Sequence, residues 1–443
     1  MISAAQIRAL FLVAVFLLLG SACATPPDPL VRHGAPPRPV IDPARPCTRE
    51  APPVAADDRT AQAGMRASFD AASNTIVVSA GEGITLPALG RAIGTPAALR
   101  EVAPGEWLLA ANLQVLAGAS LQIAAPDVRW LKLSSSPNGF VSVTATGGSL
   151  DVDGSCITSW DEGRGQVDSD HVDGRSFLLA RSSARMVIRH AELRYLGYGE
   201  VESYGLSWRT GSTTGGITTS LVSHLFYGLY TYEASGLVVQ DNEFHDNVLY
   251  GIDPHTDSHR LLIERNVVHH NGKHGIILAE DCTDSVIRDN IVYGNEHHGI
   301  VLYLRSDRNL VEGNHSFANA AQGININASV ENVVRGNHVY DNRESGVGVG
   351  QTAEATLVEN NQIRGNQQDG VRLVSEATHT TVRGNVIGEN VRHGVYIDSN
   401  GVFDLAGNTI FGNRTGVMSR SAPAEYVADN RVFDNIEAEV GEG

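Results

Sequence analysis

Residues 261–278 have the sequence LLIERNVVHHNGKHGIIL, and residues 285–302 have the sequence SVIRDNIVYGNEHHGIVL. In both segments an apolar residue, Ile263 or Ile287, is followed three places later by Asn. A second Asn comes five places after the first, and Gly comes four places after the second Asn. This shared spacing is the basis of the fold prediction.

The same pattern continues through the second half of the chain. The first Asn recurs at Asn242, Asn266, Asn290, Asn314, Asn337, Asn361, Asn385, Asn408 and Asn430. The second recurs at Asn247, Asn271, Asn295, Asn319, Asn342, Asn366, Asn390, Asn413 and Asn435. The step is 22 to 24 residues, as from Asn408 to Asn430 and from Asn242 to Asn266. Self-similarity at a fixed spacing indicates a solenoid.

The local pattern indicates which solenoid. Each repeat holds short β-branched runs separated by Asn and Gly, and no repeat holds ten residues of helical periodicity. We therefore predict an all-β, right-handed parallel β-helix with coils of about 22–24 residues. Stacked coils place equivalent side chains ~4.8 Å apart, so the repeated Asn side chains can hydrogen-bond in a ladder. Gly permits turn conformations that other residues resist.

The first part of the chain is less regular but compatible with the same fold. Residues 86–93 are expected to form a short helix that caps the first coil. Strands are expected at 107–115, 120–123, 130–133 and 140–143. Gly205 and Gly228 extend the column of closing glycines upward. The β-helix is therefore expected to form one domain from residue 61 to residue 443.

Composition limits the classes of function. The chain has 443 residues, of which 42% are hydrophobic and 19% charged, so it can bury a large core. Its formal net charge is -17. Nucleic acid is therefore not an expected partner, because phosphate contacts need clustered Lys and Arg. Any polyanionic substrate must meet a locally basic groove. We expect a monomer.

The N-terminus predicts export. A positive residue, Arg8, precedes the apolar run from Leu10 to Leu19, so residues 1–24 are interpreted as a signal peptide. Ala22-Cys23-Ala24 fits a plain cleavage site, whereas residues 20–23 resemble a bacterial lipobox in which Cys23 is lipidated. Lipidation is the preferred interpretation, and it predicts membrane attachment in the periplasm, at the outer membrane or outside the cell.

The cysteines do not form a disulfide framework. If Cys23 is lipidated or removed, Cys47, Cys156 and Cys282 remain, and an odd number leaves at least one unpaired thiol within the chain. Cys47 lies in a Pro- and Ala-rich stretch, residues 25–60, that is predicted to be an extended tether.

Exceptions to the repeat indicate where the chemistry lies. Positions counted from the closing Gly define columns along the solenoid. The column before the Gly holds Tyr204, Tyr227, Tyr250, His274 and His298; two places after it stand Ser207, Tyr230 and Asp253; four places after it stand Arg209, Tyr232 and His255. Side chains alternate across a strand, so Asp253 and His255 are expected on the outer face. Ionisable groups among aromatic rings suit a polysaccharide site, because rings stack on sugars and His titrates near neutrality.

Lys273 and Arg305 are further candidates for binding an anionic sugar. His269, His270 and His315 are expected in turns without a functional role. His274 and His298 without a third ligand make a weak metal site, and no nine-residue calcium repeat occurs. We therefore predict no metal or other cofactor, with calcium left open.

The segment from Leu249 to His255, LYGIDPH, resembles the signature of bacterial mannuronan C-5-epimerases. The similarity to the periplasmic branch of that family extends over about residues 104–390. The resemblance implies catalytic roles for Tyr250, Asp253 and His255, with His255 moving the proton at C-5 or neutralising the uronate. Substrate-binding roles are predicted for Arg209, Tyr230, Tyr232, Lys273, His274, His298 and Arg305.

The sequence departs from this family at two places. Thr256 follows His255 where the periplasmic enzymes have Asp. Ala279-Glu280 stands where they carry Ser-Arg, whose Arg is expected to neutralise the substrate carboxylate. Arg209, Lys273, His274 and Arg305 are the candidates to replace it.

Three functions follow as hypotheses. The first is epimerisation of mannuronate to guluronate within an alginate-like polyuronate, by C-5 proton abstraction and reprotonation on the opposite face. The second is a polyuronate lyase that eliminates the 4-O-linked sugar from the same intermediate. The third is a carbohydrate-binding β-helix without catalysis. In each case the expected partner is an anionic polysaccharide.

Overall fold

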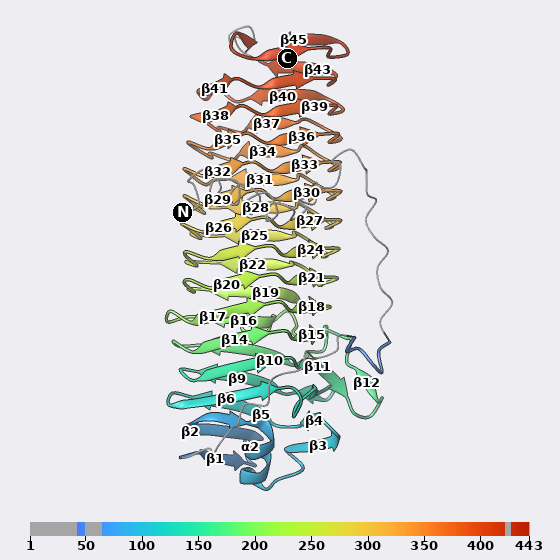
Figure 1. The fold of residues 1–443 in the computed structure, drawn as a ribbon, viewed down its shortest axis with the longest axis vertical. Coiled ribbons are helices and arrows are strands. Elements are labelled where there is room, and N and C mark those ends of the chain that lie inside the picture. Colours follow the sequence, from blue (N-terminus) through green and yellow to red (C-terminus); the bar gives the residue numbers. More distant parts are fainter. Residues whose placement is uncertain (1–41, 49–63, 421–426, 443) are drawn as a thin grey trace, which may run out of the picture. The chain divides into compact units, whose positions relative to one another are not determined.

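The computed structural model describes residues 42–48, 64–420 and 427–442. Within these residues the chain winds into stacked coils (Figure 1), and every strand from β13 to β43 that has a counterpart in the next coil pairs with it in parallel. The predicted parallel β-helix is confirmed. The signal peptide and most of the tether lie outside the described residues, so their predicted boundaries stay predictions.

Each coil contributes one strand to each of three faces. The site face, which carries the predicted functional columns, consists of β13 (Phe177–Arg181), β16 (Gly205–Arg209), β19 (Tyr227–Tyr232), β22 (Ile252–His255), β25 (Ile276–Ala279), β28 (Ile300–Tyr303), β31 (Ile324–Asn327), β34 (Val347–Gly350), β37 (Val371–Val374), β40 (His393–Asp398), β43 (Thr415–Ser419) and β45 (Ala438–Glu442).

The second face consists of β14 (Arg185–Arg189), β17 (Thr214–Thr218), β20 (Val238–Gln240), β23 (Leu262–Glu264), β26 (Val286–Arg288), β29 (Leu310–Glu312), β32 (Val333–Arg335), β35 (Leu357–Glu359), β38 (Thr380–Arg383) and β41 (Phe403–Ala406). The third face consists of β15 (Glu192–Arg194), β18 (Leu221–Ser223), β21 (Glu243–His245), β24 (Val267–His269), β27 (Ile291–Tyr293), β30 (His315–Phe317), β33 (His338–Tyr340), β36 (Gln362–Arg364), β39 (Val386–Gly388), β42 (Thr409–Phe411) and β44 (Arg431–Phe433).

The first coils are closed by a helix and an antiparallel pair. Helix α2 (Leu86–Ile93) matches the predicted cap and ends at Gly94 with φ 61°. Its Leu86 and Leu89 are buried in the core. Strand β1 (Arg66–Asp70) pairs antiparallel with β2 (Thr75–Thr85) and covers the open edge of the solenoid.

The remaining early strands are β3 (Leu99–Ala103), β4 (Glu106–Leu109), β5 (Asn112–Leu116), β6 (Ala119–Ala124), β7 (Trp130–Ser136), β8 (Gly139–Phe140), β9 (Ser142–Thr146), β10 (Ser149–Asp153), β11 (Cys156–Asp161) and β12 (Gln166–Val167). The single strand expected at 107–115 is thus two strands, β4 and β5, which belong to different faces.

Two buried ladders of Asn side chains run up the coils as predicted. In the first, Asn266 Nδ2 donates to Asn290 Oδ1 at 3.0 Å and to the carbonyl of Val239 at 2.9 Å. The backbone N–H of Asn266 donates to the same Asn290 oxygen at 2.9 Å. The second ladder repeats this arrangement, for example from Asn271 to Asn295. Each amide therefore satisfies backbone groups that the turns leave unpaired.

The closing glycines have a different physical reason from the one expected. Gly275 is not in the left-handed region. A Cβ on Gly275 would instead lie 2.5 Å from Val292 Cγ1 and 2.7 Å from the carbonyl oxygen of Gly299. From Gly228 to Gly416 the column requires Gly because the next coil approaches too closely for any side chain, whereas Gly205 has φ 119° and requires Gly for its backbone conformation.

Stacked rings line the third face. His269 was expected in a turn, but it belongs to β24 and is buried between His245 and Tyr293, with centroid distances of 5.1 and 4.8 Å. The stack continues to Phe317 and Tyr340. His315 likewise begins β30 rather than lying in a turn. The turn assignment was wrong for both residues. Strands β24 and β30 are only three residues long, and the polar His stands at one end of each, where a turn was expected.

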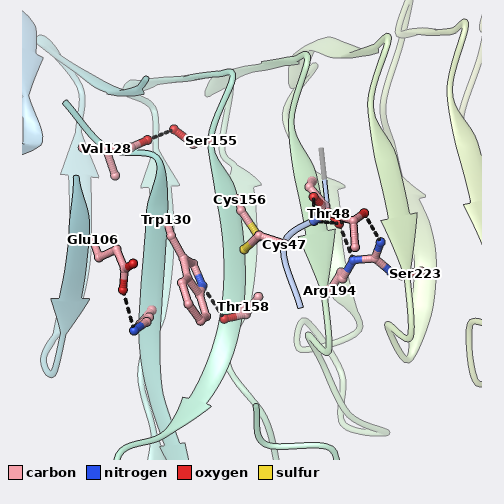
Figure 2. Close-up of a disulfide and its surroundings, with 12 residues drawn as sticks. Cys47, Thr48, Glu106, Val128, Trp130, Ser155, Cys156, Thr158, Arg194 and Ser223 are labelled. Atoms are coloured by element: carbon pink, nitrogen blue, oxygen red, sulfur yellow. Dashed lines mark hydrogen bonds and ion pairs between the residues drawn. A yellow bond between two sulfur atoms is a disulfide. The ribbon is translucent and has the colours of Figure 1, made fainter. Parts of the chain in front are cut away.

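Part of the predicted tether is fastened to the third face. Cys47 forms a disulfide with Cys156 of β11 (Figure 2). The backbone N–H of Thr48 donates to Glu192 Oε2 at 2.8 Å, and Arg194 Nε donates to Glu192 Oε1 at 2.6 Å. The expected unpaired thiol is Cys282, which is buried.

Among the described residues, no helix is long and apolar enough to cross a bilayer.

The Asn ladder predicts a measurable stability effect. In Asn290→Ala, both N–H donors of Asn266 lose their acceptor and the Ile263 carbonyl loses its donor. We expect the free energy of unfolding to fall by at least about 2 kcal/mol, because each buried unpaired group costs about 1–3 kcal/mol. Urea denaturation followed by circular dichroism measures it. Asn138→Ala, at an exposed turn, is the control; equal midpoints for the two variants would contradict a stabilising ladder.

Candidate functional site

The predicted columns are present on the site face. Tyr230 of β19 pairs with Asp253 of β22, and Tyr232 pairs with His255. In the preceding coil Arg209 pairs with Tyr232. Equivalent positions in consecutive coils therefore carry Arg209, Tyr232 and His255, at the spacing of adjacent strands. One local difference is that Gly205 pairs with Tyr227 rather than Gly228, because the register shifts between Gly205 and Ser207.

His255 ends β22 and is linked to a carboxylate through a hydroxyl. Its Nδ1 lies 2.7 Å from Thr256 Oγ1, and this hydroxyl donates to Glu280 Oε2 at 3.1 Å. Glu280 Oε2 also lies 3.8 Å from His255 Nδ1. Neither Thr256 nor Glu280 was assigned to the site from the sequence, although both mark departures from the family pattern.

The state of His255 depends on these contacts. Nδ1 donates to Thr256 Oγ1 in one tautomer and accepts from the Thr256 backbone N–H, at 3.0 Å, in the other. The first tautomer leaves Nε2 unprotonated and able to act as a base. Burial lowers the pKa of His255, the Glu280 charge opposes the shift, and Arg209 adds to it. The ring is therefore neutral at neutral pH, and Glu280 stabilises the imidazolium that forms when it takes a proton.

Asp253 is a buried carboxyl group of the site face. It is 2% exposed, and its Oδ1 has no hydrogen-bond partner among the described residues. Burial raises the pKa of Asp253 well above its ordinary value; Lys273 opposes this rise and Glu280 adds to it. Burial thus favours the protonated acid, which can donate a hydrogen bond to an anion.

Tyr250 and Lys273 form a pair at the other end of β22. Lys273 Nζ donates to Tyr250 Oη at 2.7 Å and lies 4.9 Å from the ring centroid. Tyr227 packs edge-on against Tyr250 at 5.0 Å. Tyr250 therefore carries a phenolic oxygen that is held beside a cation.

Arg209 is a buried cation in the same column as His255, two coils before it. It is 7% exposed, and its guanidinium lies 5.1 Å from the ring of Tyr230 and 4.9 Å from that of Tyr232. Its Nε and Nη1 have no hydrogen-bond partner among the described residues. A buried guanidinium with unpaired donors is costly unless a ligand satisfies it. This arrangement is expected of a site that receives an anion.

Tyrosine rings continue from Arg209 towards His255. Tyr230 stacks on His255 at 5.7 Å and meets Tyr204 edge-on at 4.8 Å. Burial raises the pKa values of Tyr230 and Tyr227, so both phenols stay protonated. Tyr204 and Tyr227 belong to the sequence column but were not assigned a role; their shared column was the signal.

The two predicted histidines of the next coils are neutral. His274 stacks on Tyr250 at 5.5 Å and on His298 at 5.2 Å. Burial lowers the pKa of His274 to about 2 and that of His298 to about 4. An uncharged imidazole cannot neutralise a carboxylate, which argues against His274 in that role. Both rings remain suited to packing against a sugar.

The structure supplies a third imidazole at this point. Ring nitrogens of His274, His297 and His298 all lie within 4.8 Å of one another. The three imidazoles are therefore close enough together to approach one metal ion. The backbone N–H of Gln322 also donates to His298 Nδ1 at 3.0 Å, which places the proton of neutral His298 on Nε2. As arranged, His298 therefore offers no unprotonated ring nitrogen to a metal ion, and binding one would require it to give up this hydrogen bond.

Arg305 forms an ion pair with Asp281 instead of facing the site. Its Nε and Nη2 donate to the two carboxylate oxygens of Asp281 at 2.7 and 2.6 Å. Beyond His255 the site face becomes apolar, because Ile277, Ala279 and Val301 form one cluster with Tyr250. Of the four candidates to replace the missing arginine, Arg209 and Lys273 remain.

A model of one protein family, described as periplasmic copper-binding protein (NosD), matches residues 195–315, 227–368 and 346–442. The matches overlap, as expected for a repeat, and together extend over more than half of the chain.

Curated relatives match a shorter part. The mannuronan C5-epimerase of Pseudomonas aeruginosa is 32% identical over 178 residues, which are 37% of this chain and 32% of the relative. That of Pseudomonas putida is 34% identical over 178 residues, which are 37% of this chain and 33% of the relative. The chain thus spans about a third of the length of these relatives.

Solved structures match over a greater length. A crystal structure of a variant of the periplasmic alginate epimerase AlgG has a TM-score of 0.72 and 26% identity, and covers 75% of this chain and 84% of that one. AlgG itself gives a TM-score of 0.71 and 25% identity, with 76% and 85% covered. The chain belongs to the family described as periplasmic copper-binding protein (NosD), and its predicted resemblance to the mannuronan C5-epimerases is confirmed.

Proposed function

We propose that this protein is a polysaccharide epimerase that converts mannuronate to guluronate residues within an alginate-like polyuronate. The observation that carries the proposal is His255, neutral and linked to Glu280, on a face where Arg209 presents unpaired donors. The similarity to mannuronan C5-epimerases supports the choice of substrate.

The first requirement of the reaction is to neutralise the uronate carboxylate. Removing a proton α to a charged carboxylate is difficult because the carbanion beside that charge is unstable. Arg209 can donate its free N–H groups to the carboxylate, and protonated Asp253 can donate a further hydrogen bond. Both groups are buried, where such interactions are stronger than in water.

The second requirement is a base. His255 Nε2 takes the C-5 proton, and the resulting imidazolium donates from Nδ1 towards Thr256 and Glu280. The family resemblance implies either this role or neutralisation of the uronate for the His of the motif, and we propose the first. Glu280 acts through Thr256 and is a positioning residue.

The third requirement is a proton donor on the opposite face of the sugar. Tyr250 stands two residues before the start of β22, which ends at His255, and we assign the return of the proton to its hydroxyl. Lys273 donates to that oxygen and stabilises the phenolate left behind. Donation to the 4-O leaving group instead would give the lyase reaction, so this pair is common to both activities.

We propose a periplasmic location, consistent with the periplasmic relative and with the predicted signal peptide. Attachment through Cys23 and a monomeric state are further proposals. The family description includes copper, and His274, His297 and His298 lie close together, but the hydrogen bond from Gln322 to Nδ1 of His298 leaves that residue no unprotonated ring nitrogen for a metal ion. We therefore propose that turnover needs no metal, with calcium the ion to test first.

Incubation with polymannuronate in heavy water separates the three functions. The epimerase is expected to give guluronate with deuterium at C-5 by NMR, and His255→Ala is expected to lose this activity while keeping its circular dichroism spectrum. His379→Ala is the matched control, because His379 is exposed beside Glu354. Unsaturated, ultraviolet-absorbing ends would indicate the lyase instead. Polymer retained on the protein without either product would indicate a binding protein.

The relay predicts a change in pH dependence. Glu280 raises the pKa of His255, so Glu280→Gln is expected to lower it further. Activity requires neutral His255 and is lost as the pH falls through its pKa; the acidic limb of the kcat/KM profile should therefore move to lower pH. The plateau should fall, because the imidazolium loses a partner. Glu376→Gln, in an exposed turn after β37, should leave the profile unchanged. An unshifted limb in Glu280→Gln would exclude the relay.

Metal removal tests the proposal that turnover needs no metal ion. Protein dialysed against EDTA is expected to keep the turnover of the untreated protein, since the proposed acid and base are both side chains. The measurement is initial rate before and after addition of calcium or copper. Restoration of a lost activity by either ion would contradict the proposal.

A further inference from the structure

A second polar cluster lies further along the site face. This distal cluster consists of Asp369, Arg372, Arg392, His393 and Tyr396, from β37, β40 and the residues that precede them. Arg372 of β37 pairs with Tyr396 of β40. Counted from the closing Gly, both occupy the position that Asp253 has in its own coil.

The cluster has two arginines for one buried acid. Arg372 Nη1 donates to Asp369 Oδ2 at 2.9 Å, and Arg392 Nε lies 3.9 Å from Asp369 Oδ1. The Asp369 side chain is 0% exposed, whereas those of Arg372 and Arg392 are 26% and 42% exposed. Asp369 Oδ1 and His393 Nδ1 have no hydrogen-bond partner among the described residues. The acid thus anchors guanidinium groups whose outer edges still face solvent.

An aromatic platform completes the cluster. Arg372 lies 4.8 Å and Arg392 5.7 Å from the ring centroid of Tyr396, and His393 stacks on the same ring at 5.5 Å. Tyr396 Oη donates to Asp398 Oδ2 at 3.2 Å, which fixes the orientation of the ring. A cationic edge beside an oriented ring is the combination that binds a sugar carrying a carboxylate.

Some other arginines of the chain pair with an acid of the adjacent coil. Arg383 of β38, on the second face, donates through Nε and Nη2 to Glu359 Oε2 of the adjacent coil at 3.0 and 2.8 Å. Such one-to-one exposed pairs contribute little and are common on stacked coils. A buried acid shared by two arginines also occurs on the second face, where Glu264 pairs with Arg265 and Arg288. The distal cluster differs because it lies on the site face and both of its arginines lie against an oriented tyrosine ring. In a chain of formal net charge -17, it is a local concentration of positive charge on the site face.

The surface between His255 and the distal cluster carries no ionised side chain in the column of Asp253. That column passes through Ile277, Val301, Asn325 and Gly348 before it reaches Arg372. The five coil steps from Asp253 to Arg372 correspond to about 24 Å at ~4.8 Å a step. One pyranose ring of an extended polymer has about the length of one coil step.

We propose that the distal cluster is a second binding subsite, for a uronate about five sugars from the residue at His255 on the same polymer chain. Arg372 and Arg392 hold the carboxylate, and the sugar ring packs on Tyr396. This inference rests on the proposed function for the identity of the sugar. It assigns the cluster the task of holding long chains in register with the catalytic coil.

Binding without turnover tests the subsite. In a His255→Ala background, calorimetry gives Kd for mannuronate oligomers of about four and about ten residues, chosen to end before or reach the cluster. Arg372→Ala is expected to weaken binding of the longer oligomer roughly ten-fold or more, the effect of losing a charge-assisted hydrogen bond. Binding of the shorter oligomer should not change. Arg383→Ala is the matched control on the second face.

The outcomes separate this proposal from the epimerase. Equal losses for both oligomer lengths, an equal loss in Arg383→Ala, or no binding of the longer oligomer by the parent protein would each overturn the subsite. Tyr396→Ala should reproduce the length-dependent loss and guards against misfolding of a single variant. If the parent protein, which retains His255, fails to exchange C-5 protons, only the epimerase proposal is rejected. The subsite proposal is tested separately, because the binding measurements require no turnover.

Discussion

The buried amide ladder is the interaction on which the rest of the structure depends. Each Asn of the first series pairs with the next through Nδ2 and Oδ1, as between Asn290 and Asn314 at 2.9 Å, and also binds backbone groups of its neighbours. A displaced coil would leave several buried polar groups unpaired at once. The ladder therefore fixes the register of the coils from Ser220 onward, and with it the positions of their outward-facing side chains.

A fixed register lets a short solenoid wall act as a rigid scaffold for chemistry. The core needs only the inward positions, such as Ile252, which is fully buried. The outward positions of the same strands are free to carry Tyr, Arg or His at the spacing of adjacent strands. Polymer substrates extend over several sugars, so a surface that repeats at a similar length is well matched to them. The aromatic and cationic columns make use of this match.

The sequence predicts what depends on periodicity: the coils, the α2 cap, and the column that joins Arg209, Tyr232 and His255. It does not predict what depends on side-chain direction or distant partners. Cys47 and Cys156 are 109 residues apart, and Cys47 lies outside the repeat, so no spacing indicates their bond. Arg305 was predicted to bind the substrate, but its side chain is turned towards Asp281 and pairs with that carboxylate.

The two departures from the epimerase pattern compensate for each other. In the family pattern an Asp stands at the position of Thr256 and an Arg at the position of Glu280. The first change alone would remove a negative charge from the site, and the second alone would remove a positive one. Together they form one hydrogen-bonded path from His255 Nδ1 through Thr256 to a carboxylate. We propose that Arg209, three coils before position 280, supplies the cation lost there, because its Nε and Nη1 have no partner among the described residues. In the proposed site the acid and the cation are thus supplied by residues of other coils than the family pattern implies.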